Sequence, residues 1–241
     1  MSTQIIHAIS GPRNISTALM YSFAQRPNCA VIDEPFYGVY LQEHGHDHPG
    51  RDATLASWPT SSEEAIQSIQ HAALGYRELY LKNMAHHMEG ESWEWAAGAC
   101  HVFWIRHPRK VIQSFTKVMK NITVNDIGLN QEWDQWQTIQ TLPGPKIIVD
   151  SDEMLEDPAH TMPQVCEALG ITWEPAMLSW SQGPKAYDGP WWPHWYDAVH
   201  RSTGFGPGKI LPPPMRPEYE TVAEAALPAY EHLFQQRLKF I

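Results

Sequence analysis

The chain has 241 residues, of which 43% are hydrophobic and 18% are charged, so it can bury a sizeable core. Its 17 basic and 27 acidic residues give a formal net charge of −10 at pH 7, which disfavours nucleic acid and anionic membranes as partners. No apolar run is long enough to span a membrane, and residues 1–4 lack the basic flank and apolar core of a signal peptide. The 3 cysteines are isolated along the chain, which is typical of buried thiols in a reducing compartment, and we expect a cytoplasmic protein.

Short apolar runs alternate with helical patterns along the first two thirds of the chain. Several runs are apolar on both faces, as buried parallel strands are, and the predicted strands cover residues 5–9, 30–33, 79–82, 102–106 and 146–149. Helical spacing and capping residues predict helices over residues 18–24, 61–74, 108–122 and 158–169. This alternation predicts an α/β fold, a three-layer sandwich with a central parallel sheet and helices on both faces.

Residues 38–60 interrupt this rhythm. The segment contains glycines and prolines and three histidines at alternate positions, His44, His46 and His48. We predict a long surface loop that could act as a lid. Alternating histidines can bind a metal, but in a Gly-rich loop this spacing is typical of solvated side chains, and we expect no metal.

The last third of the chain differs in composition. Five of the 11 tryptophans lie within residues 173–214, together with many prolines and glycines, which predicts an irregular lobe. A final helix is predicted over residues 217–238, with a kink at Pro228. We therefore expect one domain, with a core over residues 1–173 and a lobe and helix over residues 174–241.

The turn after the first predicted strand, residues 10–17, has the composition of an anion site. Arg13 supplies a forked cation, and Ser16 and Thr17 supply hydroxyl donors at the start of a helix, where unpaired N–H groups and the dipole favour negative charge. The turn lacks the second glycine and the lysine of a Walker A loop, so a different kind of phosphate or sulfate site is indicated. The alternative is an ordinary strand–turn–helix connection in which Ser16 caps the helix.

A second group of cations follows the fourth predicted strand. Arg106 stands at the strand end, Arg109 and Lys110 begin the next helix, and Ser114 lies on its second turn. Cations at a helix N-terminus oppose the helix dipole, so a bound anion would stabilise this arrangement. The alternative is a solvated helix start whose cations only increase solubility.

These motifs resemble those of the P-loop sulfotransferases, which use 3′-phosphoadenosine-5′-phosphosulfate as the sulfuryl donor. Residues 12–17 are similar to the loop P-[RK]-S-G-[ST]-[ST] of that family, except at Asn14 and Ile15. Residues 106–114 match the pattern R-x-P-x-x-x-x-x-S, and residues 152–158 resemble E-D-L-L-x-D-P. The matches occur in the order expected for the family, and the resemblance implies an α/β fold of the P-loop nucleotide-binding type.

The resemblance also implies donor-binding residues. The loop would hold the 5′-phosphosulfate through Arg13, Asn14, Ile15, Ser16 and Thr17. Arg106 and Ser114 would hold the 3′-phosphate, and the late glycine-rich segment of the family has its best counterpart around Arg201. Such a donor has two separated anionic ends, which agrees with two cationic sites at one edge of a sheet.

Ile15 stands where the family favours glycine. If the backbone there requires a positive φ, a β-branched residue costs about 1–3 kcal/mol. We expect that either the loop follows a different backbone path or Gly11 takes the strain.

The resemblance implies a mechanism without a metal. Sulfuryl transfer needs donor and acceptor held in line, a base for the acceptor proton and stabilisation of the leaving phosphate. Arg13 is the candidate for the last role, and Lys82 could support it. The candidate base is Glu34, in a Glu-Pro dipeptide like that of carbohydrate sulfotransferases. The other candidate is His86 or its neighbour His87, close to the Lys-Thr-His segment of cytosolic members.

The acceptor expected from the sequence is a small molecule or a single sugar, because an acidic surface disfavours a highly sulfated polymer. The tryptophans, with Tyr187 and Tyr196, form either the acceptor wall or a packed lobe. One alternative function is another P-loop enzyme, a small-molecule kinase or nucleotide hydrolase, with Asp33 or Asp150 binding magnesium. Another is a non-catalytic nucleotide-binding protein on a sulfotransferase frame. The oligomeric state does not follow from the sequence.

Overall fold

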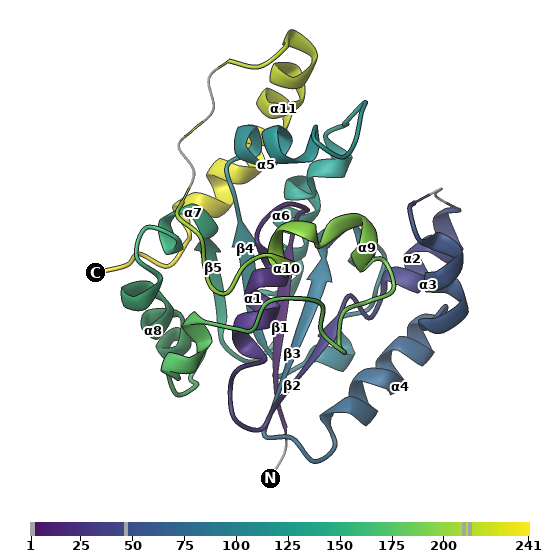
Figure 1. The fold of residues 1–241 in the computed structure, drawn as a ribbon, viewed down its shortest axis with the longest axis vertical. Helices are drawn as coiled ribbons and strands as arrows, with labels where there is room; N and C mark the ends of the chain where they lie inside the picture. The colour runs from purple at the N-terminus through teal and green to yellow at the C-terminus, as the bar shows by residue number, and fades with distance from the viewer. Residues whose placement is uncertain (1–2, 46–47, 209–210, 212–213) are drawn as a thin grey trace.

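The computed structural model describes residues 3–45, 48–208, 211 and 214–241. Within these residues lies a sheet of five parallel strands in the order β2-β3-β1-β4-β5 (Figure 1). The strands confirm the predicted runs, and they are β1 Gln4–Ser10, β2 Cys29–Asp33, β3 Glu78–Met84, β4 Cys100–Ile105 and β5 Lys146–Asp150. Ser10 of β1 is level with Met84 of β3 and Trp104 of β4, so the carboxyl ends of the strands meet at one edge of the sheet.

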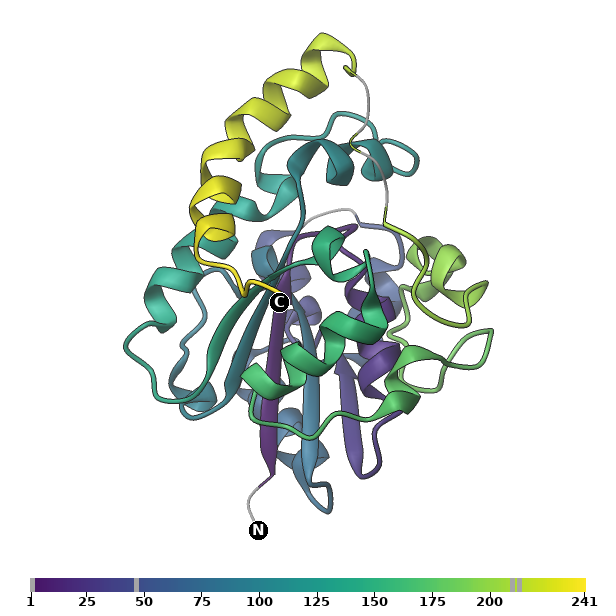
Figure 2. The same ribbon diagram turned by 90° about the vertical axis from the view of Figure 1, so that its left-hand side faces the viewer.

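Helices cover both faces of the sheet, which confirms the three-layer sandwich (Figure 2). One face packs against α4 Ser62–Ala73, α5 Pro108–Phe115, α6 Leu129–Ile139 and α11 Pro217–Gln235. The other packs against α1 Ser16–Phe23 and α8 Pro158–Ala168. Alternate strand residues serve the two faces, since Ile9 and Phe103 belong to the first core and Ile6 and Trp104 to the second.

Capping residues set several helix boundaries where the sequence predicts them. The Ser61 Oγ accepts a hydrogen bond from the Glu64 N–H at 3.3 Å, and the Glu64 carboxylate accepts one from the Thr60 N–H at 3.1 Å. Asp157 caps the start of α8, and Gly170, with a φ of 70°, follows the end of that helix. These starts and stops therefore depend on short-range hydrogen bonds.

The prediction of a long loop over residues 38–60 is wrong. The segment contains most of helix α2, Tyr37–His44, and all of helix α3, Arg51–Ser57. Gly45, with a φ of 64°, ends α2, and Gly50, with a φ of 82°, precedes α3. Gly45 and Gly50, which indicated a loop, are helix caps, because glycine adopts a positive φ without a steric cost.

The helix predicted over residues 108–122 is shorter in the structure. Helix α5 ends at Phe115, and the chain then turns into a 3-10 helix, η3 Asn125–Ile127. The Asp126 carboxylate accepts hydrogen bonds from the N–H and the hydroxyl of Thr123, both at 2.7 Å, and so favours a turn over continued helix. Ile122 is buried outside the helix, so its apolar character reflects packing and not a continuation of α5.

The described part of the Trp-rich segment, predicted to be an irregular lobe, contains short helices and lies beside α1 (Figure 1). Its elements are η4 Pro175–Leu178, α9 Trp192–Trp195 and α10 Asp197–His200. Trp180 and Trp191 are buried in the lobe, so part of its aromatic content is packing. Helix α11 continues through Pro228 and ends at Gln235, three residues before its predicted end.

Shorter elements connect the layers, and they are η1 Ala85–Met88, η2 Glu94–Ala96 and α7 Ser151–Met154. Helix α6 was not among the predicted elements. In the described part of the chain, no helix combines the length and the apolar character needed to cross a membrane.

Candidate active site

A cavity of about 700 Å³ opens at the carboxyl edge of the sheet. The loop after β1, the ends of β2 and β3, the residues around α5 and the lobe form its walls, with side chains that include Arg13, Glu34, Lys82, Arg106 and Tyr196. Ligands of parallel α/β sheets bind in the crevice beyond the strand ends. The cavity therefore brings the predicted donor loop and the predicted base to one place.

The loop between β1 and α1 has left-handed backbone at Ile15 itself. The expectation that the loop follows a different path or that Gly11 takes the strain is therefore wrong. Ile15 has a φ of 53° and Arg13 a φ of 59°, whereas Gly11 is not among the residues with positive φ. Gly11 serves close packing, because a Cβ there would lie 2.2 Å from the Ile127 carbonyl oxygen. Ile15 is the N-cap of α1 and its side chain accepts no hydrogen bond, so the reading of Ser16 as the capping residue is wrong.

Asn14, one of the two departures from the family loop, links the loop to β4 and α7 through its side chain. Its buried amide nitrogen donates to the Trp104 carbonyl at the end of β4, and its amide oxygen accepts a hydrogen bond from the Ser151 hydroxyl at 2.6 Å. The Asn14 side chain is therefore bonded to protein groups. Only its backbone remains to face a ligand in the cavity.

Two arginines lie side by side at the loop between β1 and α1. The Arg106 Nη1 donates to the Arg13 carbonyl at 3.0 Å, and the Arg13 Nε donates to the Ser114 hydroxyl at 3.2 Å. Burial and the neighbouring Arg106 charge lower the pKa of Arg13. Arg106 also pairs with Asp152 at 3.0 Å, and Lys110 pairs with the same carboxylate at 3.2 Å. The structure thus joins the two predicted anion sites into one electropositive wall.

Ser16 and Thr17 line the cavity beside this wall, but Arg201 does not. The Arg201 side chain is 69% exposed and pairs with Asp197 at 2.6 Å. Ser202 and Gly204, from the same segment, line the cavity instead. The structure therefore does not bring Arg201 to the other predicted donor-binding residues.

Glu34 follows β2 with an unusual φ of 45°, and its side chain contacts the Lys82 ammonium. The residue is only 6% exposed. Burial raises the pKa of Glu34 to about 7, and the Asp33 charge adds to this rise while the Lys82 charge opposes it. A carboxylate with a pKa near neutral suits a general base.

The two histidines proposed as alternative bases also line the cavity. The His87 Nδ1 lies 3.5 Å from the Glu34 carboxylate, and burial and the neighbouring His86 hold the pKa of His87 well below its ordinary value. Its ring stacks on Tyr37 with a centroid distance of 4.4 Å. The His86 ring lies 5.3 Å from that of Tyr40, in an edge arrangement.

Both carboxylates considered for magnesium have protein partners. Asp33 accepts hydrogen bonds from Lys82, from the Tyr196 hydroxyl and from the Gly189 N–H. Asp150 caps α7 and accepts a hydrogen bond from the Tyr230 hydroxyl at 2.9 Å. These contacts give each carboxylate a structural explanation.

The His44 and His48 side chains line the cavity, whereas His46 lies outside the described residues. Sequence reasoning missed that Tyr37 and Tyr40 join them in the cavity wall. Tyr37, Tyr40 and His44 recur at a spacing of three and four residues, a helical signal that the glycines of the segment obscured. It also missed that Tyr196 bonds to Lys82 rather than only forming an aromatic wall.

Known proteins resemble this chain in sequence and in fold. The chain is 33% identical over 231 residues to the branched-chain-amino-acid aminotransferase-like protein 1 of Arabidopsis thaliana, which covers 95% of this chain but 41% of that protein. The sulfotransferase domain of the Synechococcus PCC 7002 olefin synthase superposes with a TM-score of 0.61 at 18% identity, over 93% of this chain and 95% of that one. A sulfotransferase from Alicyclobacillus acidocaldarius superposes with a TM-score of 0.56 at 11% identity, over 99% and 98%.

At these identities the structural likeness shows the fold. The sequence pattern of the sulfotransferase domain family matches residues 4–237, which is nearly the whole chain and includes the loop between β1 and α1, helix α5 and the lobe. The chain belongs to the sulfotransferase domain family.

Proposed function

We propose that this chain is a sulfotransferase that moves the sulfuryl group of 3′-phosphoadenosine-5′-phosphosulfate to a hydroxyl or amine of a small-molecule or sugar acceptor. The observation that carries the proposal is the meeting, in one cavity, of the paired arginines Arg13 and Arg106 with the buried carboxylate of Glu34. The cations suit an anionic donor and the carboxylate suits an acceptor proton. In this proposal residues 1–173 form the core and residues 174–241 the lobe and final helix of one cytoplasmic domain.

The donor is proposed to lie along the electropositive wall. Backbone N–H groups at the start of α1, with Ser16 and Thr17, would bind the 5′-phosphosulfate, while Arg106 and Ser114 would bind the 3′-phosphate. A new anion next to Arg106 would compete with Asp152 for its guanidinium. Ser202 and Gly204 would close this end of the site in the place first expected for Arg201.

The proposed chemistry is an in-line displacement at sulfur. The Glu34 carboxylate takes the acceptor proton while the acceptor oxygen or nitrogen bonds to sulfur. The bond between sulfur and the bridging phosphate oxygen breaks, and the electron pair stays with the phosphate. Arg13 stabilises the charge that develops there, so the side chains supply the groups this step needs.

Thermal unfolding with matched nucleotides tests the donor assignment. Binding to the native state raises the melting temperature, and we expect 3′-phosphoadenosine 5′-phosphate to raise it far more than adenosine 5′-phosphate or ATP with magnesium. Equal shifts for the three ligands, or a preference for ATP with magnesium, would favour phosphoryl transfer and contradict the proposal.

A further inference from the structure

The Lys82 ammonium is held by three partners at once. It donates to the Asp33 carboxylate at 2.8 Å, to the Tyr196 hydroxyl at 2.7 Å, and to the Glu34 carboxylate. Lysine has three N–H donors, so this set uses all of them. Lys82 is 2% exposed, and its ammonium is fixed between two carboxylates that come from successive residues of the chain.

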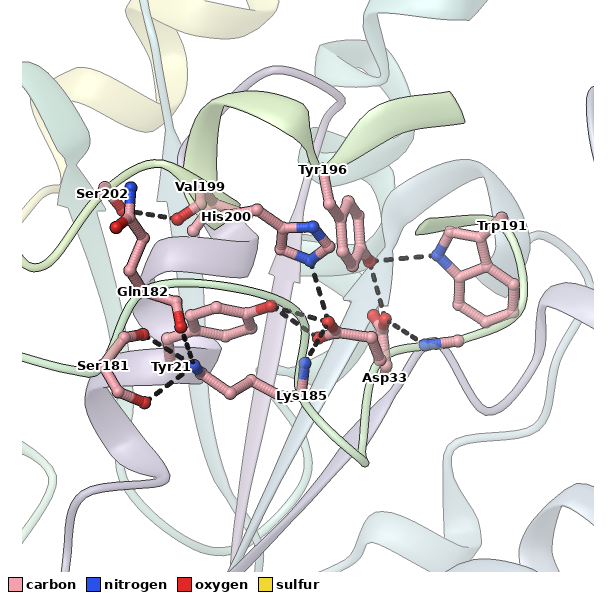
Figure 3. Close-up of polar contacts among 12 residues, drawn as sticks. Tyr21, Asp33, Ser181, Gln182, Lys185, Trp191, Tyr196, Val199, His200 and Ser202 are labelled. Atoms are coloured by element: carbon pink, nitrogen blue, oxygen red, sulfur yellow. Dashed lines mark hydrogen bonds and ion pairs between the residues drawn. The ribbon is translucent and has the colours of Figure 1, made fainter. Parts of the chain in front are cut away.

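Tyr196 brings the lobe into this cluster. Its hydroxyl donates to the second oxygen of Asp33 at 2.6 Å, and the Trp191 indole N–H donates to the Tyr196 oxygen at 3.0 Å (Figure 3). The Gly189 N–H donates to the same Asp33 oxygen at 2.9 Å. Asp33 and Tyr196 therefore hold Lys82 from opposite parts of the chain, the end of β2 and the lobe.

The titratable groups that face Glu34 come from each element around it. They are Lys82 on β3, Asp33 on β2, His87 on η1 and Tyr37 on α2, with Tyr196 on the lobe behind Lys82. Asp33 pairs with the Lys82 ammonium, which would otherwise pair with the Glu34 carboxylate alone. This sharing leaves Glu34 with more affinity for a proton than an ordinary salt-bridged carboxylate has.

We propose that Asp33 and Tyr196 are positioning residues for sulfuryl transfer. They hold the Lys82 ammonium in place, and Lys82 in turn orients the Glu34 carboxylate so that it can accept the acceptor proton. The inference rests on the proposed role of Glu34 as the base. It adds that the lobe completes the site, since Tyr196 is supplied by the segment after residue 174.

A second buried carboxylate offers a matched control. Asp188, in the lobe, accepts hydrogen bonds from the Tyr21 hydroxyl of α1 at 2.7 Å and from the Lys185 backbone N–H at 2.7 Å, and the His200 Nε2 lies 3.0 Å away. This cluster also links lobe and core through a tyrosine and an aspartate. It ends on α1 instead of on Lys82, so Tyr21→Phe tests lobe docking without disturbing the base.

The experiment compares Tyr196→Phe, Asp33→Asn and Tyr21→Phe in the full chain. For Tyr196→Phe we expect kcat to fall at least about tenfold, with the acceptor KM and the dissociation constant of 3′-phosphoadenosine 5′-phosphate within about twofold of wild type. For Asp33→Asn we expect the pH of half-maximal kcat/KM to fall by about one unit, because Glu34 then has Lys82 to itself. Tyr21→Phe should leave kcat and the pH of half-maximal kcat/KM unchanged.

A readout besides activity separates this inference from the proposed function. Carboxyl 13C NMR of glutamate-labelled protein, with Glu34→Gln to assign the signal, follows the Glu34 titration directly. A midpoint that falls in Asp33→Asn supports the inference even if no acceptor is sulfated, an outcome that would contradict only the proposed function. An unchanged midpoint, or equal kinetic losses in Tyr196→Phe and Tyr21→Phe, would overturn the inference.

Discussion

At the scale of single residues, charge placement dominates the candidate site. Arg13 and Arg106 lie next to each other although like charges repel, and the nearby Asp152 offsets part of the cost. Such an arrangement is stabilised further when an anion binds. Among the described lining residues, Lys82 is the remaining lysine or arginine of the cavity. Its charge is likewise compensated by carboxylates, those of Asp33 and Glu34.

Replacing Arg106 tests whether this residue binds the 3′-phosphate end of the proposed donor. Arg106→Ala should weaken 3′-phosphoadenosine 5′-phosphate binding about 10- to 100-fold, because a charge-assisted hydrogen bond contributes about 1.5–3 kcal/mol. Adenosine 5′-phosphosulfate, which lacks the 3′-phosphate, should lose less than about threefold. Calorimetry measures both, with Arg109→Ala as control since Arg109 pairs with Glu220. Equal losses for the two ligands would contradict the two-ended site.

The pH profile tests Glu34. Its pKa of about 7 lies above the ordinary value, so the base is protonated and inactive at low pH, and transfer should rise with pH with a midpoint near 7. Glu34→Gln should abolish transfer and leave donor binding intact, whereas His86→Gln should retain most of the rate. Steady-state kinetics from pH 5 to 9 measures the pH profile and the rates of both variants. Sustained turnover by Glu34→Gln would show that Glu34 is not the base.

At the scale of elements, the loop between β1 and α1 is held by contacts with strand β4 and with helices α6 and α7. Its left-handed residues, Arg13 and Ile15, persist because Asn14 binds the end of β4 and Ser151, while the Glu132 carboxylate on α6 accepts the Gly11 N–H. Strained backbone survives only where surrounding contacts determine it. These contacts with β4, α6 and α7 therefore fix the shape of the loop in the protein alone.

Removing the Asn14 amide should loosen this loop. Asn14→Ala leaves the Trp104 carbonyl and the Ser151 hydroxyl without these partners, and the free energy of unfolding should fall by about 1–3 kcal/mol. Donor affinity should fall as well. Urea denaturation and nucleotide titration measure the two effects, with Asn125→Ala, an exposed residue of the same cavity, as control. A variant with wild-type stability would show that Asn14 does not brace the loop.

At the scale of the whole molecule, two buried carboxylates attach the lobe to the rest of the chain. Asp33, at the end of β2, accepts hydrogen bonds from Gly189 and Tyr196 of the lobe (Figure 3). Asp188 of the lobe accepts one from Tyr21 on α1. These attachments place Tyr196, Ser202 and Gly204 over the strand ends, where they complete the cavity. The site is therefore built from both parts of the chain.

Cutting one attachment should expose the lobe. Asp188→Ala removes a fully buried carboxylate that pairs with Tyr21 and His200, and we expect about 2 kcal/mol lower stability. Residues 174–208 should be cleaved faster by a protease at low concentration while the core stays intact. Mass spectrometry of the fragments locates the cuts. Cleavage of core and lobe at the same rate would mean that the two unfold together.

The sequence by itself determined the strands, most capped helix starts and the polar residues that follow each strand, because apolar runs and capping hydrogen bonds act over a few residues. It thereby predicted that Arg13, Glu34, Arg106 and Ser114 share one edge. Tertiary structure alone decided that Lys82 bonds to Tyr196, 114 residues away. It also turned Arg201 to solvent, because the direction of a lobe side chain depends on packing between segments far apart in the chain.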